Sequence, residues 1–232
     1  MIPWTVDVVA PSPRDPRLKR WMIHDSRALS FAAPASTKFP KRDVFHKRNC
    51  PIWNQGDLGD CTANAALGCM MSDPLWNHSW AFNENDCVRL YTLETAIDDK
   101  QIPGRYPPHD TGSTGWYSFK ALQREKVVKN YLHAFGLKSA LAALVDRPIS
   151  IGIPYFDSQM DTDKDGYIRI SKNAEMMGGH QLAVNGLVVK EQFIWIAQSW
   201  GEDWGAKGWC KMTWDDFDAS LHMGGDVTYG VV

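Results

Sequence analysis

The chain lacks a long apolar run and has little net charge. No stretch of its 232 residues approaches the roughly 20 apolar residues that a transmembrane helix needs, which predicts that there is no membrane partner. The formal net charge is −2, so composition gives no electrostatic reason to expect binding to nucleic acid or to an anionic membrane. The segment from Met1 to Ala10 has neither a basic start nor a long apolar core, so we expect no secretory signal peptide.

At this length the chain can bury a sizeable core, either as one domain or as two packed lobes. Residues 1–48 contain several prolines, carry mixed charge and show no strong helical or strand period. We expect them to form an extended segment that wraps a body made by residues 49–232.

The most informative stretch is Asn54–Asn64, with the sequence NQGDLGDCTAN. A glycine-rich turn leads from Gln55 to Cys61, where small residues predict the start of a helix. A thiol at a helix start lies near unpaired N–H groups and the positive end of the helix dipole, and both favour the thiolate. The amide of Gln55 could donate a hydrogen bond beside the sulfur, where an oxyanion develops during acyl transfer. An ordinary buried cysteine is the alternative.

Two segments in the second half could supply partners for this thiol. Gly178-Gly179-His180 leads into the apolar run QLAVNGLVV, which has the pattern of a buried strand. A histidine entering a strand beside two glycines suits a general base, although a purely structural histidine is the alternative. Gln198 follows eighteen residues after His180 and opens the segment QSWGEDWG, which brings an amide in a frame of glycine and tryptophan.

Taken in order, these motifs resemble those of the papain-like cysteine peptidases. The stretch QGDLGDC is similar to the family's nucleophile segment, Gly-His plus an apolar strand to its histidine segment, and QSWGEDWG to its Asn-Ser-Trp-Gly-x-x-Trp-Gly signature. A fourth match, Gly112–Leu122, is similar to the family's substrate-binding loop and the helix after it. The resemblance extends from about residue 50 to about residue 217 and looks most like bacterial or phage members.

The resemblance implies a cysteine endopeptidase that needs no cofactor. Cys61 would be the nucleophile, and His180 would be the base that later protonates the leaving amine. Gln198 would orient the imidazole, as the third group of such a triad does. Gln55 and the backbone N–H of Cys61 would form the oxyanion hole. The residues implied to line or cover the substrate site are Gly115, Trp116, Gly179 and Trp200.

Three positions depart from the family pattern. The orienting asparagine is Gln198, which adds a methylene, so either the histidine strand shifts or the ring is held less firmly. Asp60 stands where the family usually has serine; it would cap the helix well, but its charge would raise the pKa of the thiol. Trp116 replaces the second glycine of the substrate loop, which should narrow or roof one side of the cleft.

The five cysteines leave four besides Cys61, enough for two bridges in three pairings. However, the two positions that carry a disulfide in the family are Leu58 and Ser113 here. We therefore expect free thiols and folding in a reducing compartment.

Patterning predicts a mainly helical half at about residues 50–146 and a strand-rich half at about 147–232. The helices are expected after Cys61, over Glu84 to about Asp98, near Trp116 to Gln123, and over Leu137 to Val145. The strands are expected at 149–154, 167–170, 181–189, 193–198 and 208–213. Together with the resemblance, this gives an α+β fold of two lobes, with the nucleophile on the helical lobe and the histidine on an antiparallel β lobe.

The run Asp161-Thr162-Asp163-Lys164-Asp165-Gly166 resembles the start of a calcium loop. The position that should carry a closing glutamate is Lys172, and strand-like residues flank the run. We favour a polar turn over weak calcium binding at Asp161, Asp163 and Asp165.

Three functions stay open at this point. The first is an active endopeptidase acting on bacterial cell-wall peptides or on a phage or bacterial protein. The second is an inactive papain-fold protein that binds a chain or belongs to a virion, and the third is an acyltransferase that uses the same thioester. Without a signal peptide, we expect cytoplasmic synthesis, with any exit through a virion or at lysis.

Overall fold

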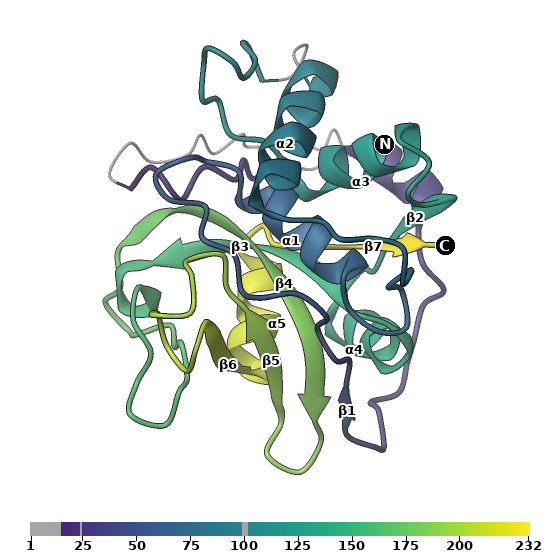
Figure 1. The fold of residues 1–232 in the computed structure, drawn as a ribbon. Helices are drawn as coiled ribbons and strands as arrows, with labels where there is room; N and C mark the ends of the chain where they lie inside the picture. Colours follow the sequence, from purple (N-terminus) through teal and green to yellow (C-terminus); the bar gives the residue numbers. More distant parts are fainter. Residues whose placement is uncertain (1–14, 24, 99–101) are drawn as a thin grey trace, which may run out of the picture.

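A computed structural model of the chain describes residues 15–23, 25–98 and 102–232. In Figure 1 three helices lie above an antiparallel sheet, and two further helices pack against that sheet. The sequence predicted this combination of a helical half followed by a strand-rich half.

The helices agree with the prediction more closely than the strands do. They are α1 (Cys61–Met70), α2 (Glu84–Asp98), α3 (Gly115–Arg124), α4 (Leu137–Asp146) and α5 (Trp214–His222), with the 3-10 helices η1 (Ser26–Phe31) and η2 (Asp157–Gln159). The strands are β1 (Val44–Phe45), β2 (Asn130–His133), β3 (Ile149–Phe156), β4 (Met176–Val188), β5 (Phe193–Ala197), β6 (Trp209–Thr213) and β7 (Asp226–Val231).

The strand predicted at 167–170 is wrong. Tyr167 makes only an isolated bridge to Lys211, because the chain is leaving a tight turn there and is not joining the sheet. Helix α5 and strands β1, β2 and β7 were not predicted.

Within the described residues, seven strands form one antiparallel sheet in the order β2-β7-β3-β4-β5-β6, with β1 paired to β4. Strand β4 is the longest and lies between β3 and β5. Its register sets Ile153 of β3 opposite His180, which fixes the histidine in the interior of the sheet.

The described residues form two large hydrophobic cores. One is formed by the sheet together with α4 and α5, and includes Leu141, Ile153 and Phe217. The other lies among α1, α2 and α3 and includes Tyr91 and Phe119. Helix α4 therefore packs with the sheet.

Helix α1 is the central helix, and all ten of its residues are buried. Its alanines keep it thin enough to pack on β4 and between α2 and α3, and Gly68 leaves room for the Arg48 guanidinium. The fully buried Glu94 of α2 links these helices, because its carboxylate accepts hydrogen bonds from Thr62 of α1 and Ser118 of α3. The buried side chains of Glu94, Thr62 and Ser118 are thereby all hydrogen-bonded, as a low-dielectric interior requires.

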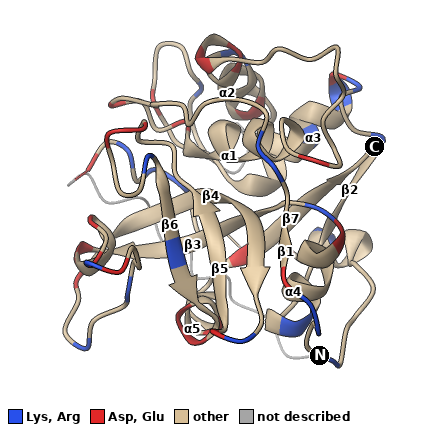
Figure 2. Ribbon diagram, turned by 60° about the horizontal axis from the view of Figure 1, so that its bottom comes forward, with Lys and Arg blue, Asp and Glu red and all other residues tan. Residues whose placement is uncertain are grey.

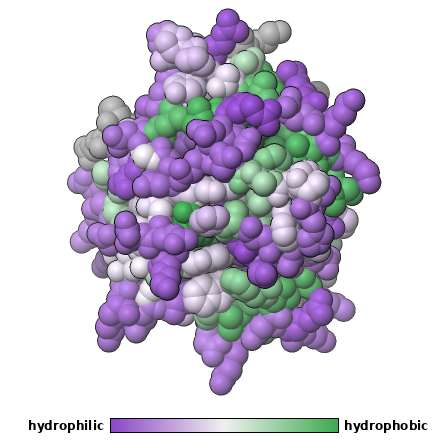
Figure 3. All heavy atoms as spheres, in the orientation of Figure 1, coloured by the Kyte–Doolittle hydropathy of each residue, from purple (hydrophilic) through white to green (hydrophobic). Residues whose placement is uncertain are grey.

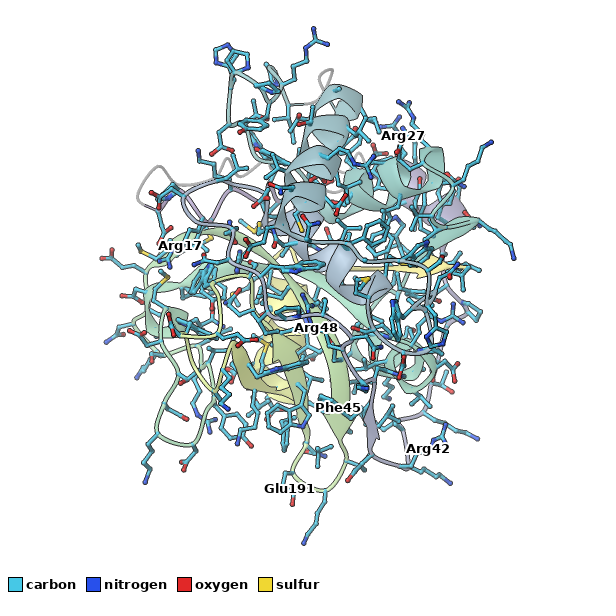
Figure 4. All side chains as sticks on the ribbon, viewed as in Figure 1. Arg17, Arg27, Arg42, Phe45, Arg48 and Glu191 are labelled. Carbon is cyan, nitrogen blue, oxygen red and sulfur yellow. The ribbon has the colours of Figure 1, made fainter. Side chains whose placement is uncertain are left out.

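The N-terminal residues lie along the outside of both cores. Phe31 stacks on Tyr131 with ring centroids 4.8 Å apart, Ala33 donates a backbone hydrogen bond to His133, and β1 pairs with β4. Figure 4 places Arg17 at the left, level with the boundary between helices and sheet, and Arg27 at the upper right beside α3. This part of the chain therefore crosses the width of the molecule.

The surface carries charges of both signs, mainly on loops and helix ends, while α1 and the centre of the sheet are uncharged (Figure 2). Phe45 is 55% exposed and contacts the rings of Trp195 and Trp209. It lies at the green apolar patch near the bottom of Figure 3, where Figure 4 labels it. Among the described helices, none combines the length and the apolar character that crossing a bilayer needs.

Asn185 ties β4 to the chain on both sides of α1. Its buried amide donates to the carbonyl of His46 at 3.0 Å and to the Ser72 hydroxyl at 2.8 Å. We expect Asn185→Ala to lower the free energy of unfolding by about 1–3 kcal/mol, because buried acceptors lose their donor. Urea denaturation measures this, with the exposed Asn77→Ala as control; equal midpoints for Asn185→Ala and wild type would contradict it.

Candidate active site

The thiol of Cys61 lies at the first residue of α1 and is fully buried. Burial is the main reason that the pKa of this thiol is raised to about 12. The backbone of Gln181 acts in the opposite direction and lowers this pKa, while the charge of Asp60 raises it further. The thiol is therefore neutral in this state, although the sequence favoured a thiolate at the helix start.

Asp60 occupies the N-cap position but does not cap the helix. Its side chain makes no capping hydrogen bond, and burial raises its pKa to about 7. The prediction of a capping aspartate is wrong, because the carboxyl is 2% exposed and faces the interior. As predicted, the charge of Asp60 raises the pKa of the Cys61 thiol.

His180 and Gln198 form the hydrogen bond that the motifs imply. The His180 Nε2 and Gln198 Oε1 atoms are 2.6 Å apart, so the longer glutamine side chain reaches the ring. The nitrogen of the same amide fixes the orientation of Gln198, because its Nε2 donates to the Tyr155 hydroxyl at 3.2 Å. The Tyr155 ring packs edge-on against His180 with centroids 5.0 Å apart.

Sequence reasoning missed Tyr155. It follows the predicted strand 149–154 by one residue, and pairs with Gly178 in the β3–β4 register. A single apolar strand pattern gives no sign of this role, because the role depends on pairing with a strand far along the chain.

The hydrogen bond to Gln198 fixes the imidazole tautomer. Since the acceptor is an amide oxygen, Nε2 carries the proton and Nδ1 keeps its lone pair. Within the described part of the chain, the buried Nδ1 has no hydrogen-bond partner. Burial lowers the pKa of His180 to about 4, so the ring is neutral and its free lone pair suits it to accept a proton.

Trp200 covers this histidine. Its indole stacks on the imidazole with centroids 5.1 Å apart and an angle of 26° between the planes. Tyr155 packs against the same indole at 5.6 Å. Water is thereby kept from the hydrogen bond between His180 and Gln198, which strengthens it.

Gln55 presents its amide as a donor, as the motif requires. Its Oε1 accepts a hydrogen bond of 2.6 Å from the Ser199 hydroxyl. This leaves Nε2 to donate to the carbonyls of Leu58 and Arg17, at 2.7 and 3.2 Å. The amide donor therefore already holds a carbonyl oxygen of the protein's own N-terminal part.

Residues 15–22, here called the strap, lie between the two lobes (Figure 1, purple). The N–H of Arg20 donates to the carbonyl of Gly179 on β4, and that of Trp21 donates to the carbonyl of Ser113 before α3. Both contacts form parallel bridges. The glycines leave room for this backbone, because a Cβ at Gly179 would lie 2.2 Å from the Arg20 carbonyl oxygen.

Side chains of the strap fasten it on both lobes. Leu18 is fully buried in the sheet core, and Lys19 pairs with Asp110 at 2.6 Å. The Arg17 guanidinium lies 4.1 Å from the centroid of the Trp200 ring. The strap thus spans from Trp200, which covers His180, to the loop before α3.

The two predicted substrate-loop residues, Gly115 and Trp116, have different surroundings. A Cβ at Gly115 would meet the Gln181 amide at 2.4 Å, so Gly115 borders β4. Trp116 instead packs in the helical core, where its Nε1 donates to the Tyr131 hydroxyl at 2.7 Å. Arg27 lies 4.9 Å above the indole. The structure therefore places Trp116 under the N-terminal chain, where the sequence predicted a roof over one side of the cleft.

The candidate calcium loop is organised as a turn. The Asp163 carboxylate accepts from the backbone N–H groups of Asp165 and Tyr167, and it pairs with Arg169 at 2.8 Å. In the part of the chain that the structure describes, no three His, Cys, Asp or Glu side chains come together as a metal site. All five cysteines are unpaired.

Acid should weaken this buried site. Because the pKa of His180 is about 4 in the folded protein and about 6.5 unfolded, the unfolded chain binds more protons between these values. Stability contributed by the neutral ring is present above pH 6.5 and is lost as the pH falls toward 4. The free energy of unfolding of wild type, relative to His180→Gln, should drop by up to about 3 kcal/mol over this window. Urea denaturation at several pH values measures this, and parallel profiles for the two proteins would contradict it.

Comparison with known proteins agrees with this geometry. The sequence profile described as papain family cysteine protease matches residues 46–229. The structure is similar to xylellain, a cysteine protease from Xylella fastidiosa, with 16% identity, a TM-score of 0.70, and coverage of 97% of this chain and 99% of that one. It is similar to digestive procathepsin L 3 of Tenebrio molitor larval midgut, with 13% identity, a TM-score of 0.62, and coverage of 87% and 74%.

The ragweed pollen cysteine protease Amb a 11 in its proform is also similar, with 14% identity, a TM-score of 0.58, and coverage of 85% of this chain and 67% of that one. No curated protein sequence matches the chain. These likenesses confirm the predicted two-lobe α+β fold. The match of the family profile over most of the chain, on the segments that hold Cys61, His180 and Gln198, shows that the chain belongs to the papain family of cysteine proteases.

Proposed function

We propose that this protein is a cysteine endopeptidase that is held latent by its own strap. The observation that carries the proposal is the hydrogen bond from Gln55 Nε2 to the carbonyl of Arg17. A donor suited to an oxyanion hole is occupied by a peptide carbonyl of residues 15–22, in the manner of a bound chain. Two of the similar structures are titled as a procathepsin and a proform, which supports a latent form.

Once the strap leaves, the side chains support acyl transfer. Water that reaches the thiol and the imidazole removes the desolvation that keeps both neutral. Nδ1 of His180 takes the thiol proton, and the sulfur attacks a peptide carbonyl. Gln55 and the Cys61 N–H stabilise the oxyanion. The imidazolium then protonates the leaving amine, and water hydrolyses the thioester with the neutral ring as base. Gln198, held by Tyr155, keeps the ring in the tautomer that these steps need.

Strap release should control the reactivity of Cys61. In the full chain, iodoacetamide should label Cys61 slowly at pH 7, because the thiol is buried and its pKa is about 12. Leu18→Asp places a charge in the sheet core and should free the strap, raising the labelling rate by at least about 10-fold. Leu29→Asp is the matched control, since Leu29 is 66% exposed on η1. Mass spectrometry of the labelled peptides gives the rate for each cysteine.

His180→Ala in the Leu18→Asp chain should abolish the gain. If Leu18→Asp does not fold, Lys19→Ala removes the strap's ion pair with Asp110 and serves the same comparison. Labelling of Cys61 no faster than that of the other cysteines in both released variants would favour the inactive binding protein over the enzyme.

We propose a peptide or protein as the substrate, and retain bacterial cell-wall peptides and phage or bacterial proteins as the two classes to separate. Leu18→Asp protein incubated with purified cell wall should release new amino groups if cell-wall peptides are cut, with Leu18→Asp/Cys61→Ala as control. Turnover of a denatured protein without release from cell wall would assign the protein class. Transfer to an added amine in place of water would instead indicate the acyltransferase.

A further inference from the structure

Arg20 of the strap is inserted in a pocket formed for a guanidinium. Its side chain is fully buried, although arginine is seldom buried without a partner. Nε donates to Gln181 Oε1 at 3.1 Å, and Nη2 pairs with Asp226 Oδ2 at 2.5 Å. We call the space lined by Gln181, Asp226 and Gly152 the Arg20 pocket.

Gln181, which lines the pocket, is held in place without help from Arg20. Gln181 Nε2 donates to the Ser150 hydroxyl at 2.8 Å, which turns Oε1 toward the guanidinium. At Gly152 an added Cβ would lie 1.9 Å from the Arg20 Nε atom. The φ angle of Gly152 is not positive. Glycine is therefore needed here to leave space for the Arg20 side chain and not for its backbone conformation.

The pocket adjoins the reacting atoms. Gln181 follows His180 directly on β4, the strand on which α1 packs. The same short stretch of β4 therefore carries His180 and one wall of the pocket, and it lies against the helix that begins at Cys61. A chain that enters the site when the strap leaves meets a carboxylate and an amide oxygen where Arg20 was.

We infer that this pocket selects arginine in the substrate, so that the peptidase cleaves next to or near an arginine. The inference rests on the proposed function and adds the class of side chain that is recognised. When the strap leaves, Asp226 loses its counter-charge inside a partly buried pocket, and a cation restores it. Arginine fits better than lysine, because one planar group can reach both Gln181 and Asp226. In the described residues, Asp226 Oδ1 has no partner, which leaves an acceptor for a second guanidinium donor.

The test uses the full chain carrying Leu18→Asp, which frees the strap, together with Arg20→Ala, which removes the strap's own side chain from the pocket. A fluorogenic peptide library that varies four positions before the cleaved bond should show arginine preferred at one of them. At that position, kcat/KM for arginine should exceed that for the neutral analogue citrulline by about 100-fold, since citrulline has a similar shape but no charge.

Asp226→Asn in the Leu18→Asp/Arg20→Ala chain should cut the ratio of arginine to citrulline by at least about 10-fold, because the charge that a guanidinium pairs with is gone. Gly152→Val should reduce cleavage of arginine peptides by filling the pocket. Asp218→Asn, on the exposed side of α5, is the matched control and should keep the ratio. No preference for arginine at any position, or a preference that Asp226→Asn leaves intact, overturns the inference.

A second measurement separates this inference from the proposed function. Agmatine, a small guanidinium compound, should bind to the Arg20→Ala chain in calorimetry and should not bind to Arg20→Ala/Asp226→Asn or to wild type. Binding without any peptide hydrolysis would overturn the peptidase and leave the guanidinium pocket standing. Hydrolysis without agmatine binding and without a preference for arginine would overturn the guanidinium pocket and leave the peptidase standing.

Discussion

The site depends on one contact, in which the start of α1 meets the middle of β4. There α1, which begins at Cys61, packs on β4, which carries His180, so one packing contact places the two candidate residues relative to each other. The contact is close because α1 is built from small residues and because β4 runs through the interior of the sheet. Both helical neighbours of α1 are bound to it through Glu94. A shift of α1 on β4 would therefore move the Cys61 sulfur relative to the His180 imidazole and disturb the helical core at the same time.

Burial explains why this arrangement is inert with the strap in place. Desolvation disfavours every charged form, so it raises the pKa of the thiol and lowers that of the imidazole. An ion pair of thiolate and imidazolium would gain Coulomb energy, but in a closed interior it loses more solvation than it gains. The helix dipole acts on the thiol in either state; it becomes decisive only when water reaches the sulfur. The strap thus controls the protonation of the pair as well as access to it.

The sequence predicted local features well and pairings between distant residues poorly. Helices α1 to α4 were predicted from local sequence patterning, and the motifs around Cys61 and His180 indicate chemistry that the resemblance then places in order. The reach of Gln198 to the ring could not be predicted, because it depends on Tyr155, which a different strand provides. Asp60 failed as a cap because tertiary burial overrode its local preference. The prediction for Trp116 was wrong for a related reason. A tryptophan in a loop motif gives no indication that Tyr131 and Arg27 will enclose it.

Latency and specificity use the same atoms in this protein. The strap is an intramolecular ligand, so it competes with substrate at the effective concentration that its attachment sets, which is about millimolar for a short flexible link. Any feature that improves the fit of a substrate arginine to Gln181 and Asp226 improves the fit of Arg20 by the same amount. The pocket therefore cannot gain affinity for its substrate without also holding its own strap more tightly. Release has to come from contacts that the substrate does not share, and the candidates are Leu18 in the sheet core and Lys19 on Asp110. Loss of those contacts weakens the strap alone and leaves the selectivity of the pocket unchanged.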